Sequence, residues 1–311
     1  MRGSGGTGML EILQKLVGTE HVWAEASMKD HTTFRVGGPA RYLAEPKDTK
    51  ELTAVIGACT KAGMPFTVMG NGSNLLVSDA GYNGVIIRLF KNMSHIWISG
   101  HFMILEAGAL LIRAASMACR EGLAGLEFAS GIPGTVGGAL VMNAGAYGGE
   151  MKDIVCCVKV LSKDGALREY TKEEMDFGYR RSRIAEEGSI VLEAELRLCP
   201  GTTEKIRARM EELKEQRVRK QPLEYASAGS TFKRPEGYFA GKLIEDAGLR
   251  GFRIGDAQVS EKHCGFVINR GNATASEIAE LIRQVQERVY AAFGVRLQTE
   301  VKFLGFGEEP L

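Results

Sequence analysis

The chain has 311 residues, and its 39 Lys and Arg against 38 Asp and Glu leave a net charge of +1. That balance excludes a broadly basic nucleic-acid-binding protein, because affinity for a phosphate backbone grows with the number of cations presented. The length corresponds to two or three domains, and 44% hydrophobic with 25% charged residues exclude a disordered chain. The 39 glycines beside only 8 prolines indicate tight turns within a fold.

The N-terminal third alternates strand and helix patterns. Residues 1–8 lack an apolar signal core, and we expect them to form a disordered tail outside the folded domain. In chain order we expect a helix at 9–17, a strand at 40–45, a helix from Asp48 to Ala62 that Gly63 ends, and strands at 66–69 and 85–89. This order is typical of a small α/β unit.

The remaining two thirds contain strand patterns and longer helical ones. We expect strands at 96–99 and 102–107, a helix at 110–121, strands at 155–161, 167–170 and 189–198 with a hairpin turn at 163–165, helices at 202–219 and 238–247, strands at 258–260 and 266–269, a helix at 274–293 and a last strand at 295–303. The mixed charges of 202–219 favour a solvated helix face, with a nucleic-acid surface as the alternative.

Six cysteines are present, and none forms a CxxC pair. We therefore expect reduced, mostly buried thiols in a cytoplasmic protein. His263 and Cys264 are the only adjacent His/Cys pair and have no third ligand nearby, so no metal site is expected. No run of 18 apolar residues occurs, so no membrane-spanning helix is expected.

A first glycine-rich segment, Gly70–Asn74, directly follows a predicted strand. It lacks the third glycine of the dinucleotide fingerprint, and no acidic residue follows about 20 residues later, so a Rossmann-type NAD site is disfavoured. Its backbone N–H groups, the Ser73 hydroxyl and the amides of Asn71 and Asn74 nevertheless suit a pyrophosphate. The alternative is an ordinary turn.

A second glycine-rich segment, Ser130–Gly138, lies about 60 residues further along. Both segments are uncharged, which favours one large phosphate-bearing ligand held by backbone groups. Two unrelated turns are the alternative. No Walker motif occurs, since Gly237 to Lys242 has the wrong spacing.

Seven motifs in a fixed order carry a resemblance to a known family. They are Thr33–Gly38, Gly70–Leu76, Gly131–Gly138, Asn143–Gly148, Tyr179–Ser182, Ala228–Lys233 and Leu297–Val301. Together they closely resemble the UDP-N-acetylenolpyruvoylglucosamine reductase family, the FAD enzymes of peptidoglycan precursor synthesis, from about residue 25 to residue 305.

The resemblance implies an α+β architecture. It implies an FAD-binding fold of the PCMH/vanillyl-alcohol-oxidase type in two α/β subdomains, 25–92 and 93–200, after an N-terminal tail and helix at 1–24 and before a C-terminal α+β substrate-binding domain at 201–311. It also implies non-covalent FAD, NADPH as hydride donor, and reduction of UDP-N-acetylglucosamine enolpyruvate to UDP-N-acetylmuramate. We expect a cytoplasmic monomer with a UDP-sugar substrate and without nucleic-acid or membrane partners.

The resemblance also implies three catalytic residues. Ser230 matches the family's proton donor, Glu300 its catalytic glutamate and Arg180 its active-site arginine. Arg180 would form a bidentate pair with the substrate carboxylate and stabilise an enolate. Without the resemblance, a turn or capping role is the favoured interpretation of Ser230, and a surface ion pair is the alternative for both Glu300 and Arg180.

The same match assigns binding residues. The cofactor-binding residues would be Gly70, Asn71, Gly72, Ser73 and Asn74 at the pyrophosphate, Ser130, Ile132, Pro133, Gly134, Thr135, Gly137 and Gly138 along the flavin and ribityl side, and Asn143, Gly145 and Tyr147 continuing that wall. The substrate-binding residues would be Tyr179, Lys233, Arg234 and Lys220.

One feature separates this chain from long-form relatives. Those carry a tyrosine-bearing loop that closes over the nucleotide, whereas the span from Arg180 to Ser230 reads as a strand and a charged helix, which is typical of the short form. Two rival functions remain: a related flavin oxidase of a small alcohol or sugar, which the N-terminal two thirds alone would permit, and a non-enzymatic nucleotide-binding module. Ser230 and Glu300 in the last third favour the reductase.

Overall fold

The computed structural model describes residues 5–307 and divides the chain into two compact units. Unit 1 contains residues up to Ala24, Tyr42–Asn71 and Val85–Arg217; unit 2 contains Glu25–Arg41, Gly72–Gly84 and residues from Val218 onward. Each unit has its own core of buried apolar side chains. The expected subdomain boundaries at residues 92 and 200 stay a prediction.

The first helix, α1 (Gly5–Val17), corrects one expectation. Residues 5–8 belong to this helix rather than to a tail, while residues 1–4 lie outside the described part of the chain. Leu13 and Val17 are buried on the apolar face that the spacing at 9–17 predicted. Packing of that face against α2 (Thr49–Lys61) is what holds the helix.

A four-stranded sheet follows in the order β1 (Val22–Ser27), β2 (Pro39–Ala44), β5 (Tyr82–Arg88) and β3 (Phe66–Met69). Strands β3 and β5 are parallel, with Phe66 opposite Val85, and the crossover of residues 70–81 that joins them contains a short strand rather than a helix. The helix α2 begins as predicted, because the Asp48 side chain accepts a hydrogen bond of 2.8 Å from the Glu51 N–H.

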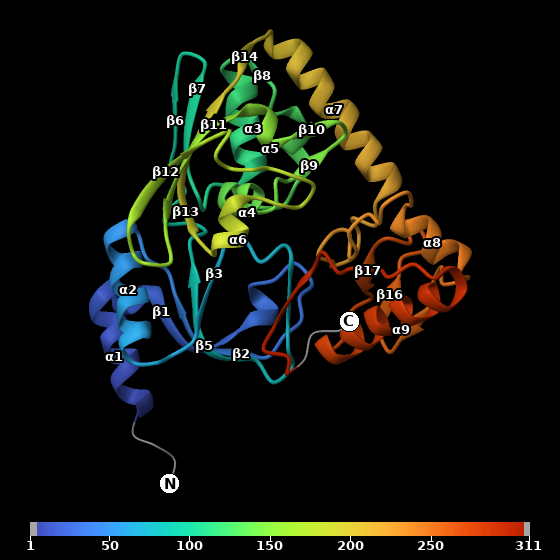
Figure 1. Cartoon of the computed structure of the whole chain (residues 1–311), viewed down its shortest axis with the longest axis horizontal. Coiled ribbons are helices and arrows are strands. Elements are labelled where there is room, and N and C mark those ends of the chain that lie inside the picture. The colour runs from blue at the N-terminus through green and yellow to red at the C-terminus, as the bar shows by residue number, and fades with distance from the viewer. Residues whose placement is uncertain (1–4, 308–311) are drawn as a thin grey trace. The chain divides into compact units, whose positions relative to one another are not determined.

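A five-stranded antiparallel sheet forms much of unit 1 (Figure 1). Its order is β12 (Leu167–Thr171), β11 (Val155–Leu161), β13 (Ile190–Arg197), β7 (Phe102–Glu106) and β6 (Ile96–Ser99). The predicted hairpin at 163–165 is confirmed: Leu161 pairs with Leu167, and Gly165 has a φ of 83°, which glycine adopts without strain.

The helices of unit 1 include three that the sequence pattern did not indicate. The helices α4 (Val136–Val141), α5 (Met151–Ile154) and α6 (Arg183–Glu187) are short, and α4 contains Gly137 and Gly138 of the second glycine-rich segment. The remaining elements are α3 (Leu111–Arg120), β8 (Leu123–Ala124), β9 (Gly145–Ala146), β10 (Gly149–Glu150), β14 (Cys199–Pro200) and the 3₁₀ turns η1 (Thr19–His21) and η3 (Glu127–Gly131).

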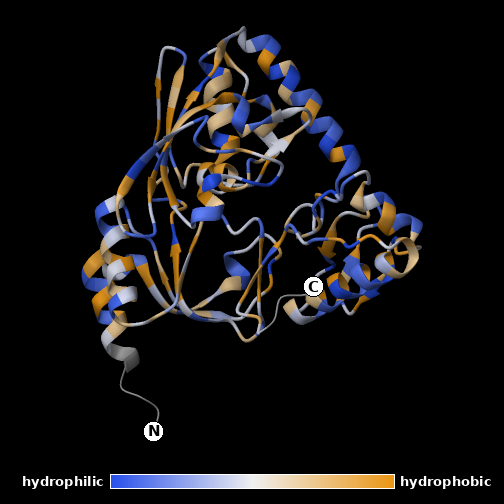
Figure 2. Ribbon diagram, in the orientation of Figure 1, coloured by the Kyte–Doolittle hydropathy of each residue, from blue (hydrophilic) through white to orange (hydrophobic). Residues whose placement is uncertain are grey.

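The long helix α7 (Thr203–Lys220) is the predicted charged helix. Only Ile206 and Leu213 among its residues are buried, and Figure 2 shows most of it in the hydrophilic colour. Exposed ion pairs such as Arg209–Glu212 line it, which fits a solvated face.

Unit 2 packs helices against short strands. Its elements are η2 (Met28–Asp30), β4 (Leu75–Val77), α8 (Ala240–Asp246), β15 (Arg253–Ile254), β16 (Ala257–Val259), β17 (Val267–Asn269), α9 (Ala275–Phe293) and β18 (Lys302–Leu304). Thr274 caps α9 in a capping box with Glu277. The last strand is shorter than expected, because only 302–304 pair with β4.

The cysteines are all free, as the sequence predicted. Cys59, Cys119 and Cys264 are buried, but Cys199 is exposed and Cys156 and Cys157 are half-buried, so "mostly buried" was wrong. Within residues 5–307, no helix is both long and apolar enough to cross a membrane.

A buried ion pair joins two strands within unit 1. Arg88 of β5 and Glu45, just after β2, are 7% and 3% exposed and form a hydrogen-bonded pair. The Glu45 carbonyl also accepts a hydrogen bond of 2.8 Å from the Asn92 side chain. Charges so far from water persist only when they are paired.

Replacing Arg88 with Met is therefore expected to lower the free energy of unfolding by about 3–5 kcal/mol, because a carboxylate stays buried without its cation. Arg209→Met, which removes a cation from an exposed pair, is the matched control and is expected to cost far less. Urea unfolding of both variants measures the difference. Equal losses would contradict the role given to burial.

Candidate active site

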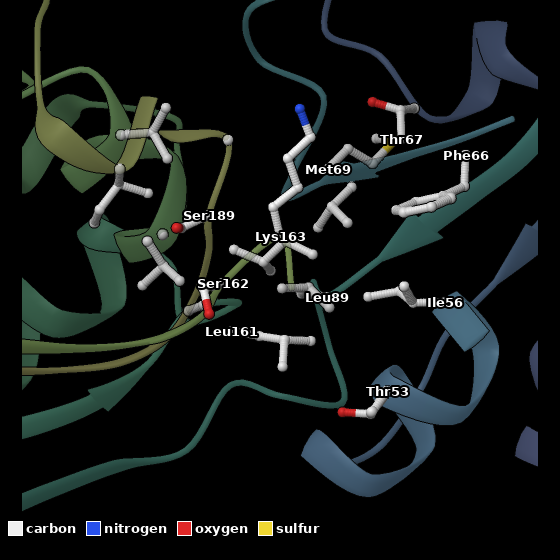
Figure 3. A pocket seen from close by; sticks show the side chains of 18 of the residues that line it. Thr53, Ile56, Phe66, Thr67, Met69, Leu89, Leu161, Ser162, Lys163 and Ser189 are labelled. Atoms are coloured by element: carbon white, nitrogen blue, oxygen red, sulfur yellow. The ribbon is translucent and has the colours of Figure 1, made fainter. Parts of the chain in front are cut away.

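A large cavity lies within unit 1. Its volume is about 860 Å³, enough for a dinucleotide-sized ligand, and most of its lining is apolar. Figure 3 shows side chains from α2 (Thr53, Ile56), from β3 (Phe66, Thr67, Met69) and from the 162–165 hairpin around it. Gly70, Thr135, Gly137 and Gly138, all predicted to bind a cofactor, line the same cavity.

Ser189 supplies an unsatisfied polar group in this cavity. Its side chain lines the pocket (Figure 3) and is 8% exposed, and its Oγ has no hydrogen-bond partner. A buried hydroxyl without a partner costs free energy, so such groups are rare unless a ligand or water completes them. Sequence reasoning missed Ser189, since nothing marks one serine near the start of a strand.

The two glycine-rich segments meet in the structure. The Asn71 side chain donates a hydrogen bond of 2.9 Å to the Pro133 carbonyl. A Cβ added at Gly70 would lie 2.1 Å from Thr135 Oγ1, so only glycine permits this approach. The expectation that both segments belong to one site thus gains geometric support, whereas two unrelated turns would not need such contact.

The second segment is partly helical rather than a loop. Thr135 caps α4, and its side chain accepts a hydrogen bond from the Gly138 N–H. The N–H groups of Val136 and Gly137 donate to the carbonyls of Ala109 and Ala107, both at 2.8 Å. These N–H groups therefore bond within the protein. What the segment offers a ligand is close approach to its backbone rather than free N–H groups.

Asn143 and Tyr147 both have a positive φ, 43° and 53°. Asn143 is almost fully buried, and its side-chain amide makes three hydrogen bonds inside the protein. Both amide donors are therefore engaged within the protein and cannot donate to a cofactor in this arrangement. Gly145 is held closely by β10, since an added Cβ would lie 2.7 Å from the Gly149 carbonyl oxygen.

Arg217 is a site-adjacent residue that sequence reasoning missed. It comes from α7, donates a hydrogen bond of 2.6 Å to the Gly131 carbonyl and lies 5.9 Å above the Tyr147 ring. Burial lowers the pKa of its guanidinium. One arginine among many in a charged helix carries no sequence signal.

Arg180 lies in a tight turn between Gly178 and Arg181. The neighbouring arginines are committed to carboxylates: Arg181 to Asp176 and Glu186, and Arg183 to Glu187. The Arg180 guanidinium lies 5.1 Å above the ring of Tyr179, which is 55% exposed.

Ser230 lies in unit 2, in an extended segment with neighbours on both sides. Ser230 forms a β-bridge with Phe266, and the Thr231 N–H donates to the Gly265 carbonyl at 2.8 Å. On the other side, the Glu300 N–H donates to the Thr231 carbonyl at 2.8 Å. Ser230 is solvent-exposed, whereas Thr231 is fully buried.

Glu300 is therefore one backbone hydrogen bond away from the residue after Ser230. It is 9% exposed, so the alternative of a surface ion pair is wrong for Glu300. The Asn74 side chain donates a hydrogen bond of 3.0 Å to the Glu300 carbonyl, and the Asn74 carbonyl accepts one from the Lys302 N–H. Asn74 thus fastens the end of the first glycine segment to the chain that carries Glu300.

Among the remaining predicted residues of unit 2 and of α7, Gly72 is buried, Lys233 is half-buried and Arg234 is exposed. Gly72 has a φ of 64°, and its carbonyl accepts a hydrogen bond from the Thr33 N–H. Lys233 bonds through its backbone N–H to the Gln298 carbonyl, and the Arg234 guanidinium lies 4.0 Å above the Phe239 ring. Lys220 is exposed at the end of α7.

Two family profiles match the chain. Residues 221–304 match the C-terminal domain of UDP-N-acetylenolpyruvoylglucosamine reductase, and residues 40–171 match the FAD binding domain. The first match contains Ser230 and Glu300, and the second contains the cavity-lining glycines Gly70, Gly137 and Gly138.

Curated relatives align over almost the full chain. The UDP-N-acetylenolpyruvoylglucosamine reductase of Agathobacter rectalis is 54% identical over 89% of this chain and 92% of its own length. That of Clostridioides difficile is 50% identical over 96% of both chains.

Solved structures agree with these alignments. The crystal structure of UDP-N-acetylenolpyruvylglucosamine reductase (MurB) from Thermus caldophilus superposes with a TM-score of 0.78 at 41% identity, covering 89% of this chain and 97% of that one. p-Cresol methylhydroxylase, at 13% identity and a TM-score of 0.50 over 96% of this chain and 67% of its own, shares the fold alone. The FAD-binding fold of the PCMH type is thereby confirmed, and the chain belongs to the UDP-N-acetylenolpyruvoylglucosamine reductase family.

Proposed function

We propose that this protein reduces UDP-N-acetylglucosamine enolpyruvate to UDP-N-acetylmuramate with NADPH and bound FAD. The observation that carries the proposal is the pairing of Ser230 and Glu300 segments in unit 2, within a chain whose other unit holds a dinucleotide-sized cavity lined by glycines. Relatives that align over almost the full chain are named for that reductase activity.

The reaction sets clear requirements for the protein. A hydride and a proton add across the enol double bond, NADPH is oxidised to NADP⁺, and negative charge develops on the conjugated carboxylate between the two additions. The chain must therefore supply a proton donor and fixed positive charge or hydrogen-bond donors for that carboxylate. FAD, when bound, supplies the hydride chemistry that amino-acid side chains lack.

The residues present fit FAD. The cavity has a suitable volume, Gly70 and Gly137 leave room where any Cβ would collide with neighbouring atoms, and the unpartnered Ser189 Oγ offers a hydrogen bond to a ligand. We assign non-covalent FAD to the residues predicted from the sequence: Gly70, Asn71, Gly72, Ser73 and Asn74, Ser130, Ile132, Pro133, Gly134, Thr135, Gly137 and Gly138, and Asn143, Gly145 and Tyr147.

We assign three residues to the chemistry. Ser230, solvent-exposed in its strand, delivers the proton to the α-carbon, a strongly basic centre for which a hydroxyl is acid enough. Arg180 pairs with the substrate carboxylate through two parallel hydrogen bonds and stabilises the enolate. Glu300, buried beside the Ser230 segment, orients the donor or shares a hydrogen bond with the carboxylate.

The nucleotide end of the substrate calls for cations. Lys233, Arg234 and Lys220 are assigned to the UDP phosphates and Tyr179 to the substrate, and the segment between Arg180 and Ser230 is the short form without a tyrosine loop. The free thiols, one of them exposed, support a reducing compartment such as the cytoplasm. The monomeric state stays a prediction.

Turnover by the purified protein tests the function. The protein is expected to be yellow with flavin absorbance and to oxidise NADPH rapidly only when the enolpyruvyl UDP-sugar is added, with product formed in equal amount. Rapid oxidation of a small alcohol or sugar with oxygen instead would indicate the rival oxidase. A colourless folded protein without affinity for FAD would indicate a non-enzymatic module.

The glycine at position 70 allows a second test. Gly70→Ala is expected to destabilise the FAD-free protein by about 1–3 kcal/mol, since the methyl group must displace Thr135, and to weaken FAD binding. Gly57→Ala is the matched control: it lines the same cavity from a helix, has open space around its Cβ, and is expected to gain about 0.5–1 kcal/mol. Urea unfolding and flavin titration measure both. A Gly70→Ala protein as stable as the parent would contradict the packing argument.

Ser230→Ala separates two steps. NADPH is expected to bleach the flavin at the parent rate, because Ser230 has no part in that step, whereas recolouring by the enolpyruvyl substrate is expected to slow by at least about 100-fold. Stopped-flow absorbance measures each step. Ser227→Ala, three residues earlier in the same segment, serves as control, and unchanged recolouring in Ser230→Ala would remove Ser230 from the mechanism.

A further inference from the structure

The turn that carries Arg180 has a conformation that its surroundings must maintain. The Gly178 N–H donates to the Arg181 carbonyl at 3.1 Å, and the Arg181 N–H donates back to Gly178 at 3.3 Å. Arg180 itself has a φ of 54°, a left-handed conformation that residues with a Cβ seldom adopt. Besides these two hydrogen bonds, contacts with neighbouring residues must therefore hold the turn in this conformation.

Asn143 provides that contact. Its Nδ2 donates to the Gly178 carbonyl at 3.1 Å and to Glu150 Oε2 at 2.8 Å, and its Oδ1 accepts from the Lys152 N–H at 3.0 Å. The side chain is 1% exposed, so these bonds form away from water. One buried amide thus joins the Arg180 turn to the segment at 150–152.

Glu150 adds an electrostatic link to the same turn. The hydrogen bond from Lys152 lowers the pKa of Glu150, and the Asn143 amide and the charge of Arg180 contribute to the same shift. Lys152 Nζ lies 2.9 Å from Glu150 Oε2. The carboxylate therefore stays charged on the side of the turn where Arg180 carries its positive charge.

We propose that Asn143 is a positioning residue, which holds the Tyr179–Arg180 turn in the conformation from which Arg180 meets the substrate carboxylate. The proposal deepens the proposed function, on which the role of Arg180 rests. It gives the Asn143 side chain a task different from the flavin contact that the sequence suggested.

Asn143→Asp and Asn143→Gly both remove the two donated hydrogen bonds. The aspartate keeps the size of the side chain and tolerates the positive φ. Glycine also tolerates the positive φ, and it adds no charge. Asn92→Asp is the matched control, because Asn92 also donates to a backbone carbonyl in unit 1, that of Glu45, and has no contact with the turn. Flavin content and the visible spectrum of each full-length holoprotein verify loading.

Hydrogen exchange tests the structural half independently of activity. The amides of residues 178–182 are expected to exchange about 10-fold faster in both Asn143 variants and at the parent rate in Asn92→Asp, because the turn loses the hydrogen bond that the Asn143 amide donates to Gly178. Unchanged exchange in both Asn143 variants would overturn the proposal, even if the protein proved not to be a reductase.

A double-mutant cycle tests the catalytic half. Asn143→Gly is expected to slow flavin recolouring by the enolpyruvyl substrate about 10-fold in the parent and less than about 2-fold in Arg180→Ala, because a residue that acts through Arg180 has nothing to position once the guanidinium is gone. The rate at which NADPH bleaches the flavin is measured in the same samples, so that a loss at the flavin is separated from a loss at the substrate step. Equal losses of rate in both backgrounds would overturn the proposal. A parent protein that is inactive toward the substrate would refute the proposed function instead, and the exchange measurement alone would then decide the role of Asn143.

Discussion

The close approach of Gly70 to Thr135 is the constraint on which the cavity depends. With no Cβ at position 70, the end of β3 comes against the side chain that caps α4, and the Asn71–Pro133 hydrogen bond fixes the two segments together. At the glycines Gly70, Gly137 and Gly138 the cavity wall is therefore backbone rather than side chain. A ligand with phosphate groups can approach such a surface closely, which side chains larger than hydrogen would prevent.

Local signals allowed most of the fold to be predicted. The strand β3 begins and ends at the predicted residues, Asp48 and Thr274 cap their helices, and the 163–165 hairpin forms at the expected turn. The short helix α4 was missed because glycine disfavours helices, and tertiary hydrogen bonds to Ala107 and Ala109 override that preference. The strand expected at 295–303 was too long, because its pairing partner, β4, lies far away in the sequence.

The residues of the candidate site could be predicted only where residue type and the order of residues in a local motif identified them. Ser230 and Glu300 were named from motifs, and the structure pairs their segments through Thr231. The tasks of Asn143 and Arg217 were not accessible, because their partners Gly178 and Gly131 lie 35 and 86 residues away in sequence. An asparagine amide forms the same kinds of hydrogen bond whether it contacts a flavin or positions a turn. Only its partners in the structure distinguish these two roles.

The division of the chain between the two units has a consequence for synthesis on the ribosome. Unit 1 is complete once Arg217 has emerged, whereas the segments 25–41 and 72–84 belong to a unit whose largest part begins at Val218. The bond between Asn74 and Glu300 spans 226 positions, so that early loop must wait for nearly the whole chain before its partner exists. Loop closure over such a span is slow, and the nascent protein carries an unfinished second core until translation nears its end.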